Sequence, residues 1–162
     1  MNNTEKNNLV IETILKHCEI VNSLQGTITN AGTADVSVDV TVGSVYGIFI
    51  ELSAKEFKKF KKVLESKPYI YKKRLENWKP INKSNFYPLY WGSSKMLGYR
   101  LQEHTRSSNQ VYTIQLNSRA ELKGKKLIYG TILCNDYKNK EKELRKNYPD
   151  VYKTAINKKE EI

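Results

Sequence analysis

The chain has 162 residues, which is enough for one domain with a hydrophobic core and short for two. Lysine and arginine number 28 against 17 aspartate and glutamate, so the net charge of +11 favours a polyanionic partner over a neutral small molecule. No apolar run approaches the roughly 20 residues that span a bilayer, and the polar N-terminus lacks a signal-peptide pattern. We therefore expect a cytoplasmic protein with no membrane partner.

The first third of the chain predicts one helix and two strands. Residues 5–22 carry apolar side chains at helical spacing. Residues 36–42, VSVDVTV, alternate valine with polar residues, as in a half-buried strand. Gly43 and Ser44 are expected to form a tight turn into residues 45–52, VYGIFIEL, whose apolar run indicates a central strand.

A basic helix is predicted after this strand. Ser53 and Glu56 have the spacing of a capping box. The apolar face of the helix would consist of Phe57, Phe60, Val63 and Leu64. Its other face is mostly lysine. Residues 66–88 contain three prolines, so they are expected to form a loop with one short helix around residues 71–78.

The second half predicts two more strands and two helices. Residues 86–92, FYPLYWG, indicate a short strand that ends in a turn at Gly92, and a helix is expected over 94–105. Residues 112–122 fit a strand or a short helix equally well, whereas residues 125–135 indicate a buried strand.

The chain ends with a helix predicted over residues 136–148, which Pro149 helps to end. Residues 151–157 are expected to pack behind it, and 158–162 to form a frayed tail. These elements predict an α+β fold, with a small antiparallel sheet flanked by helices and an N-terminal helix and strand extension.

Four side chains are candidates for chemistry. Arg100 and His104 are four residues apart, so they lie on the same face of the predicted helix. Tyr90 ends a strand ten residues earlier, and Tyr46 lies in the central strand. This group suits a phosphodiester, because a tyrosine can attack or activate water and a guanidinium can neutralise phosphate charge. Core packing of the tyrosines and an exposed Arg–His pair are the ordinary alternatives.

The segments SVYGIFI and LYWGSSKMLGYRLQEH resemble the two tyrosine strands and the arginine helix of the GIY-YIG nuclease family. The spacing from Tyr90 to Arg100, and a histidine one turn later, are similar to the phage homing-endonuclease branch. A histidine like His104 also occurs in restriction-enzyme members. The segment TIQLNSRAELKGKKLIYGTIL resembles the family's next helix, turn and third strand, which favours helix in the ambiguous stretch. The resemblance covers residues 43–52 and 86–157.

The chain also departs from the family pattern. The family's tyrosine strands are normally joined by a short hairpin, whereas Tyr46 and Tyr90 are 44 positions apart. A basic insertion over residues 53–85 must separate them. The strings SVY and YWG are degenerate forms of the motifs. The alternatives to Tyr46 as the first tyrosine are Tyr69, Tyr71 and Tyr87.

A metal-binding carboxylate is expected on the last helix. Its apolar face is defined by Tyr137, Leu144 and Tyr148. Glu141 falls on that face, where a carboxylate is costly to bury unless it binds a cation or pairs, whereas Glu143 points away. The resemblance implies a glutamate in this position, and it implies an asparagine beyond a proline. Asn157 fits that description, with Asn147 as its competitor.

The resemblance implies a mechanism. A divalent cation, Mg²⁺ or alternatively Mn²⁺, would be held by Glu141 and water and would contact the phosphate and the leaving 3′ oxygen. Tyr46, or a water that it activates together with His104, would be the general base. Arg100 would stabilise the transition state, and Tyr90 would orient the attacking group or the phosphate.

The basic insertion predicts contacts with double-stranded DNA, although a solvated helix face is equally compatible with its lysines. The candidate phosphate contacts are Lys58, Lys59, Lys61, Lys62, Lys72, Lys73, Arg74 and Lys95. We expect one nuclease domain over residues 1–162, with 1–42 as an N-terminal extension, 43–157 as the core and 158–162 as the tail.

The expected function is metal-dependent hydrolysis of DNA by a sequence-specific, restriction-type endonuclease, and a homodimer that cuts both strands is compatible with it. One alternative is a nonspecific or structure-directed nuclease of repair or mobile elements. The other is a catalytically inactive protein that binds nucleic acid.

Overall fold

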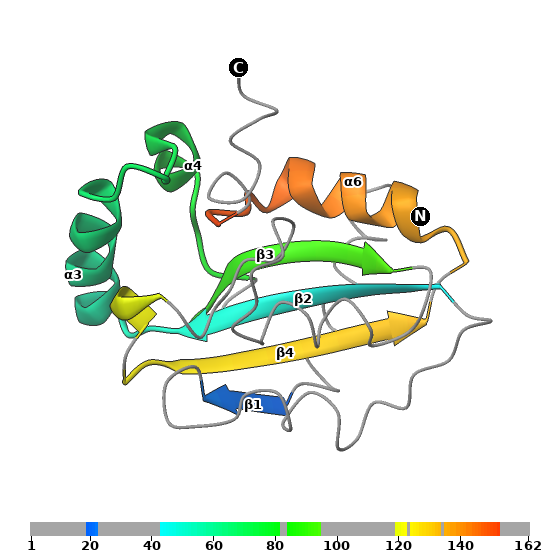
Figure 1. Ribbon diagram of the computed structural model, residues 1–162, viewed down its shortest axis with the longest axis horizontal. Coiled ribbons are helices and arrows are strands. Elements are labelled where there is room, and N and C mark those ends of the chain that lie inside the picture. Colours follow the sequence, from blue (N-terminus) through cyan, green and yellow to red (C-terminus); the bar gives the residue numbers. More distant parts are fainter. Residues whose placement is uncertain are drawn as a thin grey trace.

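The computed structural model describes residues 19–22, 43–81, 84–94, 119–122, 124–133 and 135–152. Within them the chain has an α+β fold, in which strands form one antiparallel sheet and helices lie against it (Figure 1). The strands are β1 (Glu19–Asn22), β2 (Ser44–Glu51), β3 (Phe86–Ser94) and β4 (Lys126–Leu133). The helices are α3 (Ala54–Glu65), α4 (Lys72–Glu76), the 3₁₀ turn η2 (Ala120–Leu122) and α6 (Tyr137–Asn147). The predicted α+β class with an antiparallel sheet is confirmed.

The described strands are ordered β1-β4-β2-β3, and all neighbours are antiparallel. The predicted central position of β2 is confirmed, because β2 pairs with both β3 and β4. Nearly all of β2 is buried, as expected for a strand covered on both faces. The turn predicted at Gly43 and Ser44 is wrong for Ser44, which already pairs with Ser94 and Leu133 in the sheet.

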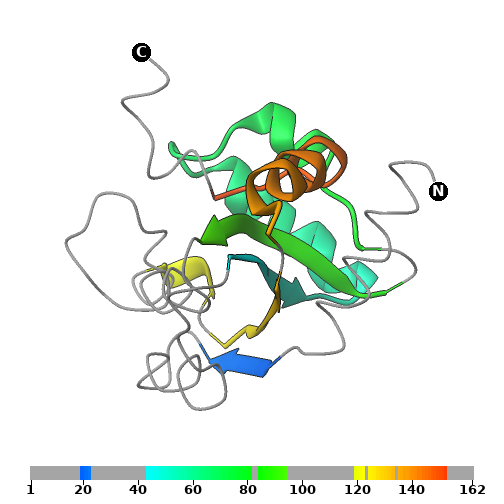
Figure 2. The same cartoon turned by 90° about the vertical axis from the view of Figure 1, so that its right-hand side faces the viewer.

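Two apolar clusters lie on the two faces of the sheet. The first joins alternate residues of β2, such as Tyr46 and Ile48, to side chains of α3 and α4. The second joins the intervening residues Val45 and Phe49 to Leu144 of α6. Helix α6 runs beside β3, which is the edge strand opposite β1 (Figure 2). The predicted helix over 136–148 is confirmed.

The basic insertion is part of the core. The capping box at Ser53 is confirmed, because its hydroxyl accepts the amide of Glu56 and the Glu56 carboxylate accepts the amide of Ser53. The predicted apolar face of α3 is only partly confirmed. Phe60 and Leu64 are buried, whereas Val63 is 43% exposed. The predicted short helix is α4, and the buried side chains of Leu75 and Trp78 join the first cluster.

Two further expectations are corrected. Residues 19–22 form a strand, where a helix was predicted, because they pair with β4 and complete its second edge. Gly92 does not form a turn, since β3 continues through it to Ser94. Of residues 112–122, the described part is one 3₁₀ turn, η2. The rest of the first predicted helix, the strand over 36–42 and the helix beyond Ser94 lie outside the described residues.

The outer edge of β3 is covered by hydrogen-bond donors from elsewhere in the chain. The Trp78 indole donates to the carbonyl of Pro88 at 2.5 Å, the Tyr152 amide to Leu89 at 3.4 Å, and the Arg145 guanidinium to Trp91 at 2.7 Å. These donors occupy carbonyls that would otherwise face outward from the sheet. None of the helices in the described ranges is long and apolar enough to cross a membrane.

Candidate active site

Tyr46 and Tyr90 lie side by side although the insertion separates them. Their ring centroids are 6.1 Å apart and their planes differ by 27°. The register of β2 and β3 explains this contact, because Tyr46 lies opposite Gly92 and Tyr90 lies opposite Ile48. Both tyrosines therefore project from the same face of the sheet at diagonal positions. The long insertion leaves the two tyrosine strands directly paired.

Gly92 provides the space for this arrangement. A methyl group on Gly92 would overlap the ring of Tyr46, at Cζ and the hydroxyl oxygen. Glycine is therefore required by a close approach between the Tyr46 ring and the backbone of the neighbouring strand. Tyr46 is 2% exposed, whereas Tyr90 is half-buried and is the outer member of the pair.

The alternative tyrosines have different surroundings. Tyr87 is buried and stacks on Phe57, with ring centroids 4.6 Å apart, and desolvation raises its pKa. The Tyr69 hydroxyl donates to the Glu121 carboxylate. Tyr71 is 42% exposed. Of the four tyrosines considered for the first strand, Tyr46 is the one that stacks on Tyr90 within the described residues.

Glu141 projects from α6 toward β3. Its carboxylate accepts a hydrogen bond from the Ser93 hydroxyl and forms an ion pair with Arg145, Nη2 to Oε1 2.7 Å. The Glu141 side chain is 20% exposed. Glu143 instead pairs with Lys140 on the same helix at 3.6 Å. This geometry separates the two carboxylates, and Glu141 is the one that lies next to the tyrosine strand.

Arg145 connects Glu141 to the tyrosine pair. Its guanidinium lies 5.5 Å from the centre of the Tyr90 ring and also donates to the carbonyl of Trp91. Because side chains alternate along a strand, Gly92 and Ser93 face opposite sides of the sheet. Glu141 therefore lies across the edge of β3 from the tyrosines and reaches them through Arg145. Among the described contacts, Glu141 touches neither tyrosine directly.

The sequence interpretation did not include Ser93 or Arg145. Arg145 follows Glu141 by four residues, so helical spacing alone places both on one face of α6. Ser93 follows Gly92 in the strand and takes the opposite face. These two spacings are the signals that were present in the sequence.

The donor chemistry around Glu141 fits a hard divalent cation. Carboxylate and hydroxyl oxygens are the ligands that Mg²⁺ and Mn²⁺ prefer, and a carboxylate has lone pairs left after accepting two hydrogen bonds. The described residues contain no group of three or more His, Cys, Asp or Glu side chains that could hold a metal. Glu141 would therefore be the protein ligand of the cation, and water molecules would supply the remaining ligands. The adjacent Arg145 guanidinium opposes a second positive charge there.

Four predicted site residues lie outside the described ranges: Lys95, Arg100, His104 and Asn157. The insertion lysines are described. Lys58, Lys59 and Lys62 on α3 are exposed, and none of the three forms an ion pair with another described residue. Lys73 on α4 is also exposed.

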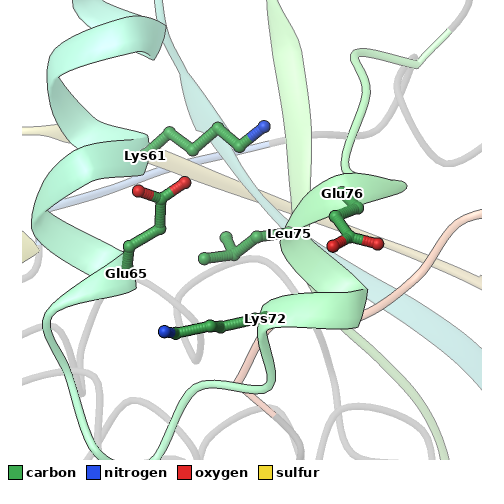
Figure 3. A pocket seen from close by; sticks show the side chains of 5 residues that line it. All are labelled: Lys61, Glu65, Lys72, Leu75 and Glu76. Atoms are coloured by element: carbon green, nitrogen blue, oxygen red, sulfur yellow. The ribbon is translucent and has the colours of Figure 1, made fainter.

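Two of the candidate lysines share a hollow with carboxylates. Lys61 and Lys72 line a hollow of about 180 Å³ between α3 and α4. Glu65 and Glu76 line the same hollow, so its four charges balance (Figure 3). Arg74 donates to the carbonyl of Asp150 at 2.8 Å, which favours a structural role. The nearby carboxylates make Lys61 and Lys72, of which Lys72 is exposed, less favourable for phosphate than Lys58, Lys59 and Lys62.

Helix α3 begins just beyond the end of β2 (Figure 1). Tyr46 is near the start of the strand, and the helix cap Ser53 follows the strand's end. Seven residues of extended chain span about 23 Å, so the N-terminus of α3 lies well along the sheet from the tyrosine pair.

A second polar cluster ties the insertion to the end of the described chain. The Glu121 carboxylate accepts hydrogen bonds from the hydroxyls of Tyr69 and Tyr152. The Arg119 guanidinium lies 4.6 Å from the centre of the Tyr69 ring. Tyr152 is fully buried, and desolvation, followed by the negative charge of Glu121, raises its pKa well above 10.0. Desolvation lowers the pKa of Arg119. These contacts connect three segments that are distant in the sequence, which contain Tyr69, Glu121 and Tyr152.

Comparisons with protein-family models, with curated proteins and with solved structures returned no match to this chain.

Proposed function

We propose that this protein is a metal-dependent endonuclease that hydrolyses DNA phosphodiester bonds, with a restriction-type enzyme as the specific form. The observation that carries the proposal is the stacking of Tyr46 on Tyr90 across a 44-residue separation. A pair of strand tyrosines is what the resemblance to GIY-YIG nucleases requires. Its formation depends on Gly92, a residue that the same resemblance includes.

The exposure of the two tyrosines refines their proposed roles. Tyr90 is the outer residue, so it is the one that contacts the phosphodiester or the attacking water. Tyr46 is buried behind it and supports the Tyr90 ring; acting as the general base would require its hydroxyl to become accessible. Arg100 and His104 would supply the guanidinium and the second proton acceptor, as the resemblance implies.

Glu141 would hold the cation in this proposal, with Ser93 orienting the carboxylate. A bound divalent cation supplies charge neutralisation at the phosphate and at the leaving oxygen. Arg145 keeps the carboxylate beside the edge of β3, close to the Tyr90 ring. The chain's own contribution is thus to bring one carboxylate, one guanidinium and one phenol to the same strand edge.

The lysines of α3 support double-stranded DNA as the partner. The N-terminus of α3 lies about 23 Å from Tyr46 along β2, roughly seven nucleotide steps of one DNA strand, so one duplex could reach both the α3 lysines and the tyrosine pair. Lys58, Lys59 and Lys62 would bind phosphates without reading base sequence. Sequence specificity would have to come from other side chains.

Cleavage of supercoiled plasmid in Mg²⁺ or in EDTA tests the proposal. We expect Mg²⁺-dependent cleavage. Glu141→Gln, Tyr90→Phe or Arg100→Ala should each reduce its rate about 10²- to 10³-fold, which is the usual effect of removing one group that stabilises transition-state charge. Glu143→Gln is the matched control, because Glu143 is on the same helix but pairs with Lys140. Cleavage that survives all three substitutions would disprove the site. Discrete fragments indicate a restriction-type enzyme, and a smear indicates a nonspecific nuclease.

A second candidate is a protein that binds nucleic acid without cutting it. The ion pair between Glu141 and Arg145 favours it, because the carboxylate already has a cationic partner. The exposed lysines of α3 would serve binding equally well without catalysis. Retarded migration of a duplex in a gel, with no cleavage in Mg²⁺ or Mn²⁺, would select this function over the nuclease.

A further inference from the structure

Arg145 makes three different contacts at the edge of β3. Its Nη2 lies 2.7 Å from Glu141 Oε1 and 2.7 Å from the carbonyl oxygen of Trp91, and its guanidinium carbon lies 5.5 Å from the centre of the Tyr90 ring. The side chain is 19% exposed, and its buried Nε has no hydrogen-bond partner among the described residues. One guanidinium nitrogen therefore serves both a carboxylate and a backbone carbonyl.

The arginine occupies one of the two carboxylate oxygens that a cation could use. Ser93 donates to Oε2 of Glu141 and Arg145 contacts Oε1, so a divalent cation would bind a carboxylate that already has a cationic partner. Two positive charges against one partly buried carboxylate repel each other, since screening by solvent is incomplete there. Cation binding to Glu141 must therefore weaken or displace the Arg145 contact.

Arg145 has other partners that could hold it after displacement. The Trp91 carbonyl and the Tyr90 ring remain in contact with the guanidinium without Glu141. After displacement, the Nη2–H group that Glu141 had accepted would be available to an anionic oxygen. A phosphodiester oxygen is such an acceptor, and arginine binds it with paired N–H donors.

We propose that Arg145 is a positioning residue that competes with a divalent cation for Glu141. In the free protein the guanidinium occupies the carboxylate and keeps cation affinity low. A phosphodiester beside Tyr90 draws the guanidinium away and raises that affinity. The cation and the phosphodiester rest on the proposed function, whereas the Arg145 contact that would compete with the cation is observed.

Binding of Mn²⁺ to the full-length protein without DNA, followed by calorimetry, tests the competition. Arg145→Gln should bind Mn²⁺ about tenfold more tightly than the wild type, because a charge-assisted contact to Glu141 is lost. Arg145→Lys keeps the charge and should bind as weakly as the wild type. The double substitution Arg145→Gln with Glu141→Gln should abolish the gain. Equal or weaker binding by Arg145→Gln, or a gain that persists in the double variant, overturns the proposal.

A measurement on the wild type covers the case in which Arg145→Gln does not fold, as judged by circular dichroism. The Nε–H resonance of Arg145 should shift during a titration with Mg²⁺, and Glu141→Gln should remove the shift. A resonance that stays fixed up to tens of millimolar Mg²⁺ contradicts the competition. Failure of the proposed function would appear differently, as plasmid that is neither bound nor cut, while the Mn²⁺ affinities would still differ.

Discussion

The ring of Tyr46 lies over the backbone of Gly92, its direct partner across the β2–β3 pair. Tyr90 lies two residues before Gly92 on the same face and stacks on Tyr46. The position of the tyrosine pair therefore depends on the absence of a side chain at Gly92. This relationship can be tested separately from general damage to the sheet, because Gly47 meets aromatic side chains on the opposite face.

Gly92→Ala should displace Tyr46 from Tyr90, because the added methyl group would overlap the Tyr46 ring. We expect a loss of about 1–3 kcal/mol in unfolding free energy, as for other overpacked sites. Gly47→Ala is the matched control, since its methyl group would meet Phe49 and Trp91 at 2.6 Å. Both variants should be less stable by urea denaturation. Only Gly92→Ala should change the NMR ring signals of both tyrosines, and unchanged signals would contradict the packing.

Replacing Lys58 and Lys62 by glutamine should weaken binding to duplex DNA and flatten its salt dependence. Each lost phosphate contact should reduce the slope of log affinity against log salt by about 0.9. Lys61 and Lys72 provide a control pair with the same loss of charge, because they line a hollow that Glu65 and Glu76 also line. Fluorescence anisotropy over a range of salt concentrations measures both pairs. Equal slopes for the two double variants would argue against α3 as the DNA surface.

The unfolding free energy should fall as the pH rises above about 10. Burial raises the pKa of Tyr152 in the folded state above its ordinary value of 10.0. The folded state thus retains a proton that the unfolded chain loses. The contribution is complete below the unfolded pKa and disappears as the pH approaches the folded value. Tyr87 and Tyr148 act in the same direction, since burial raises both pKa values.

Tyr152→Phe isolates the contribution of Tyr152 to this pH dependence. Urea denaturation between pH 8 and pH 11.5 measures the unfolding free energy of the variant and of the wild type. The variant should be less stable near neutrality, because it loses the hydrogen bond to Glu121. The unfolding free energy of the variant should then decline less steeply with pH than that of the wild type, and the two slopes should differ by up to about 1.4 kcal/mol per pH unit. Tyr71→Phe is the control, since Tyr71 is 42% exposed. A decline as steep as in the wild type would show that Tyr152 does not titrate in this manner.

Ser53→Ala should destabilise the protein by about 1 kcal/mol, because the first turn of α3 loses the acceptor for the Glu56 amide. Ser53→Asp keeps an acceptor and should be nearly neutral. Thermal unfolding followed by circular dichroism compares them. Since α3 contributes Phe60 and Leu64 to the core, the loss should appear in the global transition. A stability change confined to local fraying would show that α3 is not coupled to the sheet.

The elements predicted correctly have signals that lie close together in the chain. The capping box of α3 needs only Ser53 and Glu56, and the apolar run of β2 indicates a buried strand by itself. Helix α6 follows from its periodicity and from Pro149. Such local signals do not depend on which segments pair in the folded molecule.

The errors arose where the deciding partner is far away. Residues 19–22 have helical spacing, yet their partner β4 is more than 100 residues later. Gly92 follows aromatic residues as a turn glycine would, but its role depends on Tyr46. Arg145 and Ser93 were missed because their importance depends on how α6 lies against β3. Tertiary packing fixed these features, and one sequence does not reveal it directly.

The covered edge of β3 limits how two copies of this chain can associate. Exposed edge strands attract strands of neighbouring molecules, because their carbonyl and amide groups seek partners. At Pro88, Leu89 and Trp91 those carbonyls are already occupied from within the chain. A continuous sheet formed through the β3 edges of two copies would require these internal bonds to break. Two copies would therefore have to associate through another surface, and the same covering protects this edge against strand-to-strand aggregation.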